Sequence, residues 1–500
     1  MISPVARNAL LSLLTQVAPL IVALFAIPIL LAHLGIARFG VLSLGWVVLG
    51  YATALDLGVA RAATKRIAQS LGGDQPQLLE RIGPTALGVN LMLGLAGGML
   101  FAFAAPVFVS GVLRTPPDLV EDTYRALLVV AAGIPVILLH SATRGVLEGA
   151  QRFDLVAIVA IPSSVLSYLL PAVGAAQGAP LWVLVLMIVF VRLIAVASYA
   201  SLWRRAAPTV RFFAFPERDL AIALLRYGGW LTISNATSPV VLYGERAVVG
   251  ATLGITGLGL YVIPYEVAAR FAVVPGAIYA AVFPAFSTVA GRVAADVAAI
   301  YRRSVGFVLL VLSPLTTMVI ALSADLLRIW LGGDIATKTA VPLQLFAAGA
   351  LANSLAYIPL ALLQASGRPD LPAKLQIVEI IPTFLVTWFL SGNLGLPGAA
   401  LAWFLRMATD TVLLFILAGR LTPEVRFPQL DNIGRSILIA IAGVLTAVAL
   451  TKLDPWGLRA GLTAAVVFVL LAGIWKSSLT LAERASVIEQ ASRFVPTRGD

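Results

Sequence analysis

The amino-acid sequence predicts an all-α polytopic membrane protein, and composition and the length of the apolar stretches carry this prediction. Of the 500 residues, 60% are hydrophobic and 12% are charged, whereas a soluble domain has roughly 25% charged residues. Many apolar stretches run about 18–25 residues, the length at which a helix crosses ~30 Å of hydrocarbon. We see no ~10-residue segments of alternating polarity, as a β-barrel would require. The first stretch, Leu10 to Ala32, is too long for a signal peptide, so we expect it to be retained.

We expect about fourteen transmembrane helices, one for each apolar stretch. The stretches are 9–32, 39–60, 83–110, 124–143, 155–174, 180–202, 224–249, 257–285, 304–323, 341–363, 375–391, 397–418, 434–451 and 458–475. The eighth contains Pro264, Pro275 and Pro284, so its inner end is expected to turn.

The distribution of basic residues predicts the topology. If the N-terminus is inside and the spans alternate, 24 Lys and Arg residues lie on the inner side and 7 on the outer side. Cytoplasmic loops carry such an excess of positive charge. The sequence therefore predicts that both termini are cytoplasmic, and the net charge of +11 reflects topology rather than nucleic-acid binding.

Two motifs occur twice in the chain. LGIARFG at 34–40 is similar to LGITGLG at 253–259, and LEGAQRFDL at 147–155 is similar to LQASGRPDL at 363–371. In each pair, the two copies of the motif are separated by nearly the same length of chain. Each repeat therefore contains six spans. An even number of spans preserves orientation, so we expect parallel repeats.

The repeat predicts the domain organisation. We expect a six-helix bundle in 1–203, a cytoplasmic linker in 204–223 and a second six-helix bundle in 224–420. An additional two-helix segment follows in 434–475, and a cytoplasmic tail in 476–500.

Four stretches carry a family resemblance. They are LLAHLGIARFGVLSL (31–45), ALDLGVARAATKRIAQ (54–69), GVLEGAQRFD (145–154) and LLRYGGWLTISNATSPVVLYGERAVVGATLGITGLGLYVIPYEVA (224–268). With these, the chain resembles the polysaccharide (Wzx-type) flippase branch of the multidrug/oligosaccharidyl-lipid/polysaccharide (MOP) exporter superfamily. The resemblance implies a MATE-like, two-lobed helical fold with a cationic cavity.

The resemblance also implies what the protein does. It implies translocation of a lipid-linked diphosphate oligosaccharide across the bacterial inner membrane, for O-antigen, exopolysaccharide or capsule synthesis. Membrane lipids are implied partners, a polysaccharide polymerase and chain-length proteins are candidate partners, and H⁺ or Na⁺ is a candidate coupling ion. No nucleic acid and no cofactor are expected.

Charges inside spans are the best indicators of the binding site, because each costs roughly 2.5–3.5 kcal/mol to insert at mid-membrane. Arg246 and its neighbour Glu245 lie in the seventh span, Arg270 in the eighth and Arg192 in the sixth. Arginine suits a diphosphate because its planar fork donates two hydrogen bonds to phosphate oxygens. The alternative for each is a structural ion pair with another helix.

Two further candidates end the second span. Asp56 and Arg61 are expected near the inner mouth of the cavity. A structural ion pair is the default interpretation for Glu266, Arg406 and Asp410. Arg270 has Glu266 four residues before it, and Arg406 has Asp410 four residues after it, which is the spacing of a helical ion pair. Glu379 is the other charge inside a span, and it is left without an expected partner.

The sequence argues against an enzyme. It has no Cys, no Walker A motif, no HExxH and no GxSxG, so we expect neither a catalytic residue nor a metal site. A membrane polymerase or ligase would carry a large external loop, and the longest expected here is 324–340. Two alternatives to the oligosaccharide flippase stay open. They are a drug/cation antiporter of the same superfamily and a flippase for the peptidoglycan lipid precursor.

Overall fold

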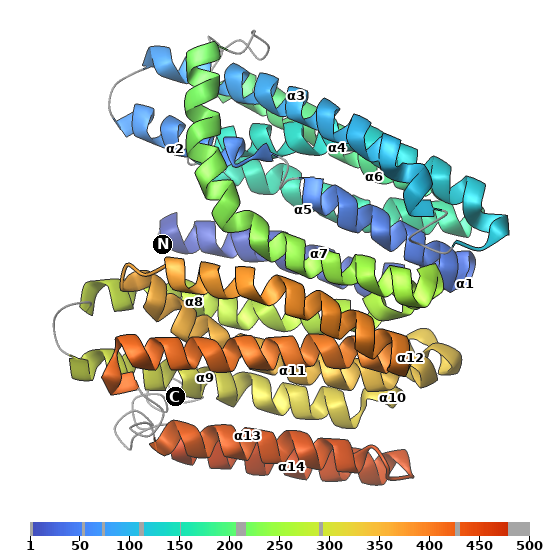
Figure 1. Ribbon diagram of the computed structural model, residues 1–500, viewed down its shortest axis with the longest axis vertical. Coiled ribbons are helices and arrows are strands. Elements are labelled where there is room, and N and C mark those ends of the chain that lie inside the picture. Colours follow the sequence, from blue (N-terminus) through green and yellow to red (C-terminus); the bar gives the residue numbers. More distant parts are fainter. Residues whose placement is uncertain are drawn as a thin grey trace, which may run out of the picture. The chain divides into compact units, whose positions relative to one another are not determined.

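The computed structural model describes residues 4–52, 56–72, 76–109, 115–150, 152–206, 217–289, 294–425 and 431–478. Within these residues every regular element is a helix and no strand occurs (Figure 1). The all-α prediction is therefore confirmed.

Short 3₁₀ segments separate some of the α-helices. The α-helices are α1 (Pro4–Ala52), α2 (Val59–Gly72), α3 (Pro76–Val107), α4 (Val120–Gly149), α5 (Phe153–Ala176), α6 (Leu181–Ala206), α7 (Arg218–Ala269), α8 (Val273–Val289), α9 (Ala294–Ala321), α10 (Ser323–Leu331), α11 (Gly333–Ala365), α12 (Asp370–Leu421), α13 (Asp431–Leu450) and α14 (Trp456–Ser478). The 3₁₀ segments are η3 (Pro117–Leu119), η4 (Arg270–Ala272) and η5 (Pro423–Val425).

Three helices are too long to be single spans. Helices α1, α7 and α12 have 49, 52 and 52 residues, and a straight helix of that length would measure about 75 Å, more than twice the hydrocarbon thickness. Each is interrupted by a glycine with positive φ: Gly35 (72°), Gly254 (72°) and Gly395 (65°). Among the described residues, 11 helices are long and apolar enough to cross a membrane. Division of these three helices gives the predicted fourteen spans.

The backbone confirms the sequence repeat at the first pair of motifs. Gly35 has φ 72° and ψ 170°, and Gly254 has φ 72° and ψ 179°. Only glycine adopts this conformation without strain. The two motifs therefore interrupt their helices with the same backbone geometry.

The second pair of motifs is equally similar in structure. The amide of Arg152 donates to Leu147 O at 2.9 Å, and the amide of Arg368 donates to Leu363 O at 3.0 Å. Arg152 pairs with Asp154 and Arg368 with Asp370, each with 3.0 Å between Nε and Oδ1. The hydrogen bond that each arginine donates to its aspartate raises the pKa of both arginines above the ordinary value.

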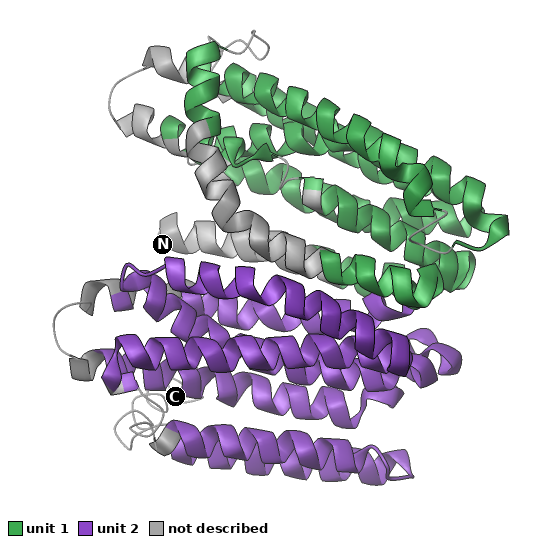
Figure 2. Cartoon of the chain, in the orientation of Figure 1, with its two compact units in different colours: residues 1–259 green, residues 260–500 purple. Residues whose placement is uncertain are grey.

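The chain divides into two compact units, residues 1–259 and 260–500 (Figure 2). In the first unit, α3 packs along α4, α4 along α6 and α1 along α5. Its core contains Ile82, Leu87, Tyr199 and Trp203, all buried. The predicted boundary in the 204–223 linker stays a prediction.

The second unit is organised around α11 and α12, which pack along each other. Its core holds an aromatic cluster in which Tyr261, Tyr265 and Trp403 surround Phe346. The ring centroids of Tyr261 and Trp403 lie 5.0 and 5.3 Å from that of Phe346. Helices α13 and α14 pair with each other and with α9, so the two additional helices are part of this unit.

Apolar side chains are exposed along the helices, as a lipid-facing surface requires. Phe103 on α3 is 86% exposed, Phe468 on α14 is 73% exposed and Val378 on α12 is 70% exposed. A water-soluble protein would bury such side chains, so these faces are suited to contact lipid.

Two short helices differ from the sequence prediction. The expected exterior loop 324–340 consists of α10 and the beginning of α11, and α2 follows Asp56 on the expected inner side. Helix α10 was not apparent because its nine residues are too few to cross the membrane. The expected eighth span, 257–285, is divided near its middle by η4, and its inner end lies within α8, where the expected turn does not occur.

Two glycines of the first repeated motif bring backbones into contact within the first unit. A Cβ atom on Gly40 would lie 2.4 Å from Ile255 O, and a Cβ atom on Gly259 would lie 2.7 Å from Ile36 O. The contact is reciprocal, because Ile36 and Ile255 occupy the same position of the motif, as do Gly40 and Gly259. Any residue larger than glycine would separate the two segments.

Candidate functional site

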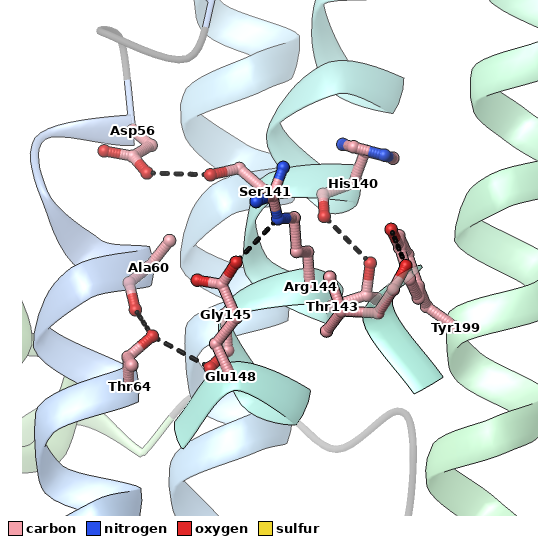
Figure 3. A network of polar contacts seen from close by, with 11 residues as sticks. Asp56, Ala60, Thr64, His140, Ser141, Thr143, Arg144, Gly145, Glu148 and Tyr199 are labelled. Atoms are coloured by element: carbon pink, nitrogen blue, oxygen red, sulfur yellow. Dashed lines mark hydrogen bonds and ion pairs between the residues drawn. The ribbon is translucent and has the colours of Figure 1, made fainter. Parts of the chain in front are cut away.

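The candidate site is a polar network inside the first unit, where α2, α4 and α6 meet (Figure 3). Helix α4 contributes His140, Ser141, Arg144 and Glu148 to one stretch of its length. These residues follow a helical spacing, so their side chains emerge along neighbouring faces of α4. Polar groups at this density are unusual inside an apolar bundle and mark a functional site.

Asp56 is held at the break between α1 and α2. Its Oδ1 accepts a hydrogen bond from the amide of Gly58 at 2.6 Å, and its Oδ2 accepts one from Ser141 Oγ at 3.3 Å. Leu57 and Gly58 both have positive φ, 48° and 70°, which turns the chain tightly there. Asp56 is buried, so this carboxylate lies inside the bundle as a fixed acceptor.

Small residues allow α2 to approach α4 closely. Thr64 Oγ1 donates to Gly145 O at 2.8 Å and also contacts Ala60 O at 2.9 Å. A Cβ atom on Gly145 would lie 2.9 Å from Thr64 Oγ1, and one on Gly149 would lie 2.8 Å from Thr64 O. These two glycines, four residues apart, are thus a close-packing motif of membrane helices.

Two arginines give the network its positive charge. Arg144 Nε donates to Glu148 Oε1 at 2.7 Å, and its side chain is 45% exposed. Arg192 is half-buried on α6, and the groups that act on it electrostatically include Tyr168, Tyr199 and Arg144. Arg144 and Arg192 therefore act on each other electrostatically, and the carboxylates of Glu148 and Asp56 balance their charge within the network.

An aromatic pair closes one side of the network. The ring centroids of His140 and Tyr199 are 5.5 Å apart. Tyr199 is fully buried and its hydroxyl donates to Val156 O at 3.4 Å. This pair fixes α4 against α6 at the level of Arg144.

The opposite face of α6 borders an apolar groove of about 300 Å³ along α5. Its lining includes Ile158, Pro162 and Leu166 from α5, and Ile194 and Ser198 from α6. Arg192 and Tyr199 do not line this groove.

The predicted site residues separate into three groups. Asp56 and Arg192 take part in the network around α4. Glu245 and Arg246 are buried on α7, at 1% and 6% exposure, in the same unit. The side chain of Arg61 lies outside the described residues.

Arg270 is in the other unit, where its Nη2 lies 2.8 Å from Glu266 Oε2. The helical ion pair expected from their spacing is formed, and both side chains are partly exposed. Arg270 is the one predicted cavity arginine in the described second unit, so the network around α4 does not contain it.

The sequence did not indicate Ser141, Thr64, Arg144 or Tyr199 as site residues. Ser and Thr occur throughout membrane helices, where their hydroxyls hydrogen-bond to the preceding turn of the helix. Arg144 lies next to the end of an expected span, so it was assigned to an interior loop. The doubled glycine Gly145-x-x-x-Gly149 was the available signal, since it marks where another helix approaches.

A family model matches about a third of the chain. Residues 12–173 match the model named MatE. A protein of Shigella flexneri named "Putative O-antigen transporter" is 27% identical over 418 residues, which cover 83% of this chain and 98% of the relative. The chain is thus similar to membrane transporters of the MOP superfamily.

Solved structures of this superfamily share the fold. An inward-facing multidrug resistance MATE family transporter superposes with a TM-score of 0.67 at 15% identity, covering 83% of this chain and 98% of that one. The lipid II flippase MurJ, in an inward closed conformation, superposes with a TM-score of 0.67 at 14% identity, covering 97% and 100%. The MOP resemblance stated from the four sequence stretches is confirmed.

Proposed function

We propose that this MOP transporter moves a lipid-linked oligosaccharide across the cytoplasmic membrane by alternating access, for O-antigen, exopolysaccharide or capsule synthesis. The observation that carries the proposal is the similarity to the Shigella flexneri relative, which extends over 98% of that protein. A likeness of this extent takes in most of this chain.

The charge of the site supports an anionic cargo. Arg144 and Arg192 are close enough to interact, and Arg246 is buried in the same unit. Guanidinium groups bind phosphate oxygens through paired hydrogen bonds. A diphosphate headgroup would therefore find complementary charge here, while its lipid tail stays in the bilayer.

Long-range ion pairs support the proposed orientation. Arg81 pairs with Glu217, and the charge bias assigns both to the inner side. Asp325 pairs with Arg459, and the charge bias assigns both to the outer side. These pairs support the alternation of the spans, and with the charge bias we propose an inner-membrane protein with both termini in the cytoplasm.

A second candidate is a flippase for the peptidoglycan lipid precursor. MurJ covers 97% of this chain, whereas the MATE transporter covers 83%, and the larger coverage favours a lipid-linked cargo over a drug. Both candidate cargoes present a diphosphate, so the same arginines would serve either one. A polysaccharide polymerase and chain-length proteins are proposed partners for the first candidate.

Complementation tests the two candidates against each other. The gene is expressed in one strain that lacks its O-antigen transporter and in another depleted of MurJ, with protein level checked by blot. We expect surface polysaccharide to return in the first strain and growth to fail in the second. Restored growth without polysaccharide would favour the peptidoglycan precursor as the cargo. If a well-expressed protein restores neither polysaccharide nor growth, both candidates are contradicted.

A further inference from the structure

Three charged side chains lie within the membrane-spanning part of α12 without forming an ion pair. Glu379 is 8% exposed, and neither of its carboxylate oxygens has a hydrogen-bond partner. Arg406 Nε is likewise buried without a partner. Arg406 and Asp410 have the spacing of a helical ion pair, but in the described structure no such pair forms between them.

The three residues come together because α12 reverses at Gly395. In a straight helix, Glu379 and Asp410 would be separated by about 45 Å. Instead, the charges that act on Glu379 are those of Asp410 and Arg406. Glu379 precedes Gly395 by 16 residues and Asp410 follows it by 15, so the two arms of the hairpin place these residues at a similar level.

Among the described residues of α11 and α12, every other charged side chain lies near a helix end. Helix α11, which packs along α12, carries Asp334 and Lys338, and these pair with each other at 2.9 Å. On α12 itself, Asp370 pairs with Arg368 and Lys374 at its beginning. The tyrosine of α11, Tyr357, is a neutral phenol at ordinary pH.

The cluster lacks one positive charge. Two carboxylates and one guanidinium leave a net charge of −1 at a depth where an isolated charge is costly. A single proton makes the cluster neutral. A metal ion is a poor alternative, because Arg406 would repel it and the described residues contain no group of three or more metal-ligating side chains.

We propose that Glu379, Arg406 and Asp410 form a binding site for one proton, held mainly on the Glu379 carboxyl. When the proton is bound, Arg406 is free to pair with Asp410 on its own arm of α12. When the proton leaves, Arg406 is drawn to the Glu379 carboxylate on the opposite arm. Proton binding thereby changes the contact across the Gly395 bend.

The proton site itself does not depend on the proposed function. Its role does, because that role is to couple the proton gradient to movement of the cargo. The movement of Arg406 between two carboxylates shifts the relative stability of two arrangements of the hairpin. A coupling device needs such a differential interaction with two states of the protein.

Infrared spectroscopy of the purified full-length protein in lipid nanodiscs tests the site without any cargo. Exposed carboxyls have pKa values near ~4 and are ionised above roughly pH 6. We expect a protonated-carboxyl band that persists above that pH in the wild type and is absent in Glu379→Gln. Glu121→Gln removes an exposed carboxylate paired with Arg125, and this control should keep the band.

Two further variants distinguish a shared proton from an isolated acid. Asp410→Asn leaves one carboxylate for one guanidinium, so the band should disappear. Arg406→Gln leaves two carboxylates without a cation, so the band should grow. A band that is unchanged in Glu379→Gln, or that grows in Asp410→Asn, would overturn the site.

Export measured in the complemented strain separates the site from the proposed function. If the proton is coupled to export, Glu379→Gln should lose polysaccharide export at least tenfold, whereas Glu379→Asp should retain part of it. Loss of the band with normal export would mean that the proton site exists but is not coupled. The band with no export by the wild type would count against the cargo and leave the site intact.

Discussion

Asp325 and Arg459 form a buried ion pair that connects α10 to α14, in which one guanidinium nitrogen contacts both carboxylate oxygens. Arg459 Nη2 lies 2.7 Å from Asp325 Oδ1 and 2.6 Å from Oδ2, and both residues are 8% exposed. Arg459 Nη1 also donates to Leu453 O at 3.0 Å. The pair therefore fixes the additional two-helix segment to the rest of the second unit.

Removal of one partner should destabilise the protein strongly. Asp325→Asn leaves a buried guanidinium without its counter-charge, and such a loss costs about 3–5 kcal/mol. We expect a clear fall in the thermal unfolding midpoint in detergent, followed by tryptophan fluorescence. The double variant Asp325→Leu with Arg459→Met should recover most of the loss.

The matched control for this pair is Lys338→Gln. Lys338 pairs with Asp334 on α11, but the two side chains are 49% and 74% exposed. Exposed pairs contribute roughly 0–1 kcal/mol, so the midpoint should hardly change. An unfolding midpoint of Asp325→Asn equal to that of Lys338→Gln would contradict the structural role of the buried pair.

The backbone contact at Gly40 should not tolerate a methyl group. In Gly40→Ala the new Cβ would lie 2.4 Å from Ile255 O, and overpacking of this kind costs typically about 1–3 kcal/mol. Gly50→Ala on the same helix is the control, because no atom lies within 4 Å of its Cβ position. Thermal unfolding of both variants checks this, and equal midpoints would show that the contact is not tight.

Single cysteines can test the orientation, since the natural chain contains none. Arg125 and Lys374 have side chains that are 58% and 71% exposed, and the charge bias assigns them to opposite sides. A membrane-impermeant maleimide should label Arg125→Cys in intact spheroplasts and Lys374→Cys only after permeabilisation. The reverse pattern would place both termini outside.

The cargo proposal predicts that charge at Arg246 matters more than volume. Arg246→Ala should reduce polysaccharide export strongly, and Arg246→Lys should keep part of it. Arg270→Ala is expected to have a smaller effect, because Arg270 is already paired with Glu266 at 2.8 Å. The control is Arg125→Ala, an exposed arginine with a local partner. Normal export by well-expressed Arg246→Ala and Arg270→Ala would leave both residues as structural partners.

The fold could be predicted from sequence because its determinants are local. Apolar stretches of sufficient length define the spans, and the repeated motif places Gly35 and Gly254 at equivalent bends. The ion pair of Glu266 and Arg270 followed from spacing on one helix. Each of these signals lies within a few residues of sequence.

The site depends on contacts between distant segments, which the sequence does not show. Asp325 and Arg459 were assigned to the same side of the membrane, but nothing indicated that they touch. The pair expected from the spacing of Arg406 and Asp410 does not form. Both residues interact electrostatically with Glu379, which lies on the other arm of α12. Uncharged partners such as Ser141 carry no sequence signal of their own.

The reciprocal contact of Gly40 and Gly259 has the form of an isologous dimer interface. In such an interface each of two identical surfaces contacts the other around a two-fold axis. Here both surfaces belong to one chain, so the internal repeat makes the contact with itself, and a side chain at either glycine would disturb the same contact from opposite sides.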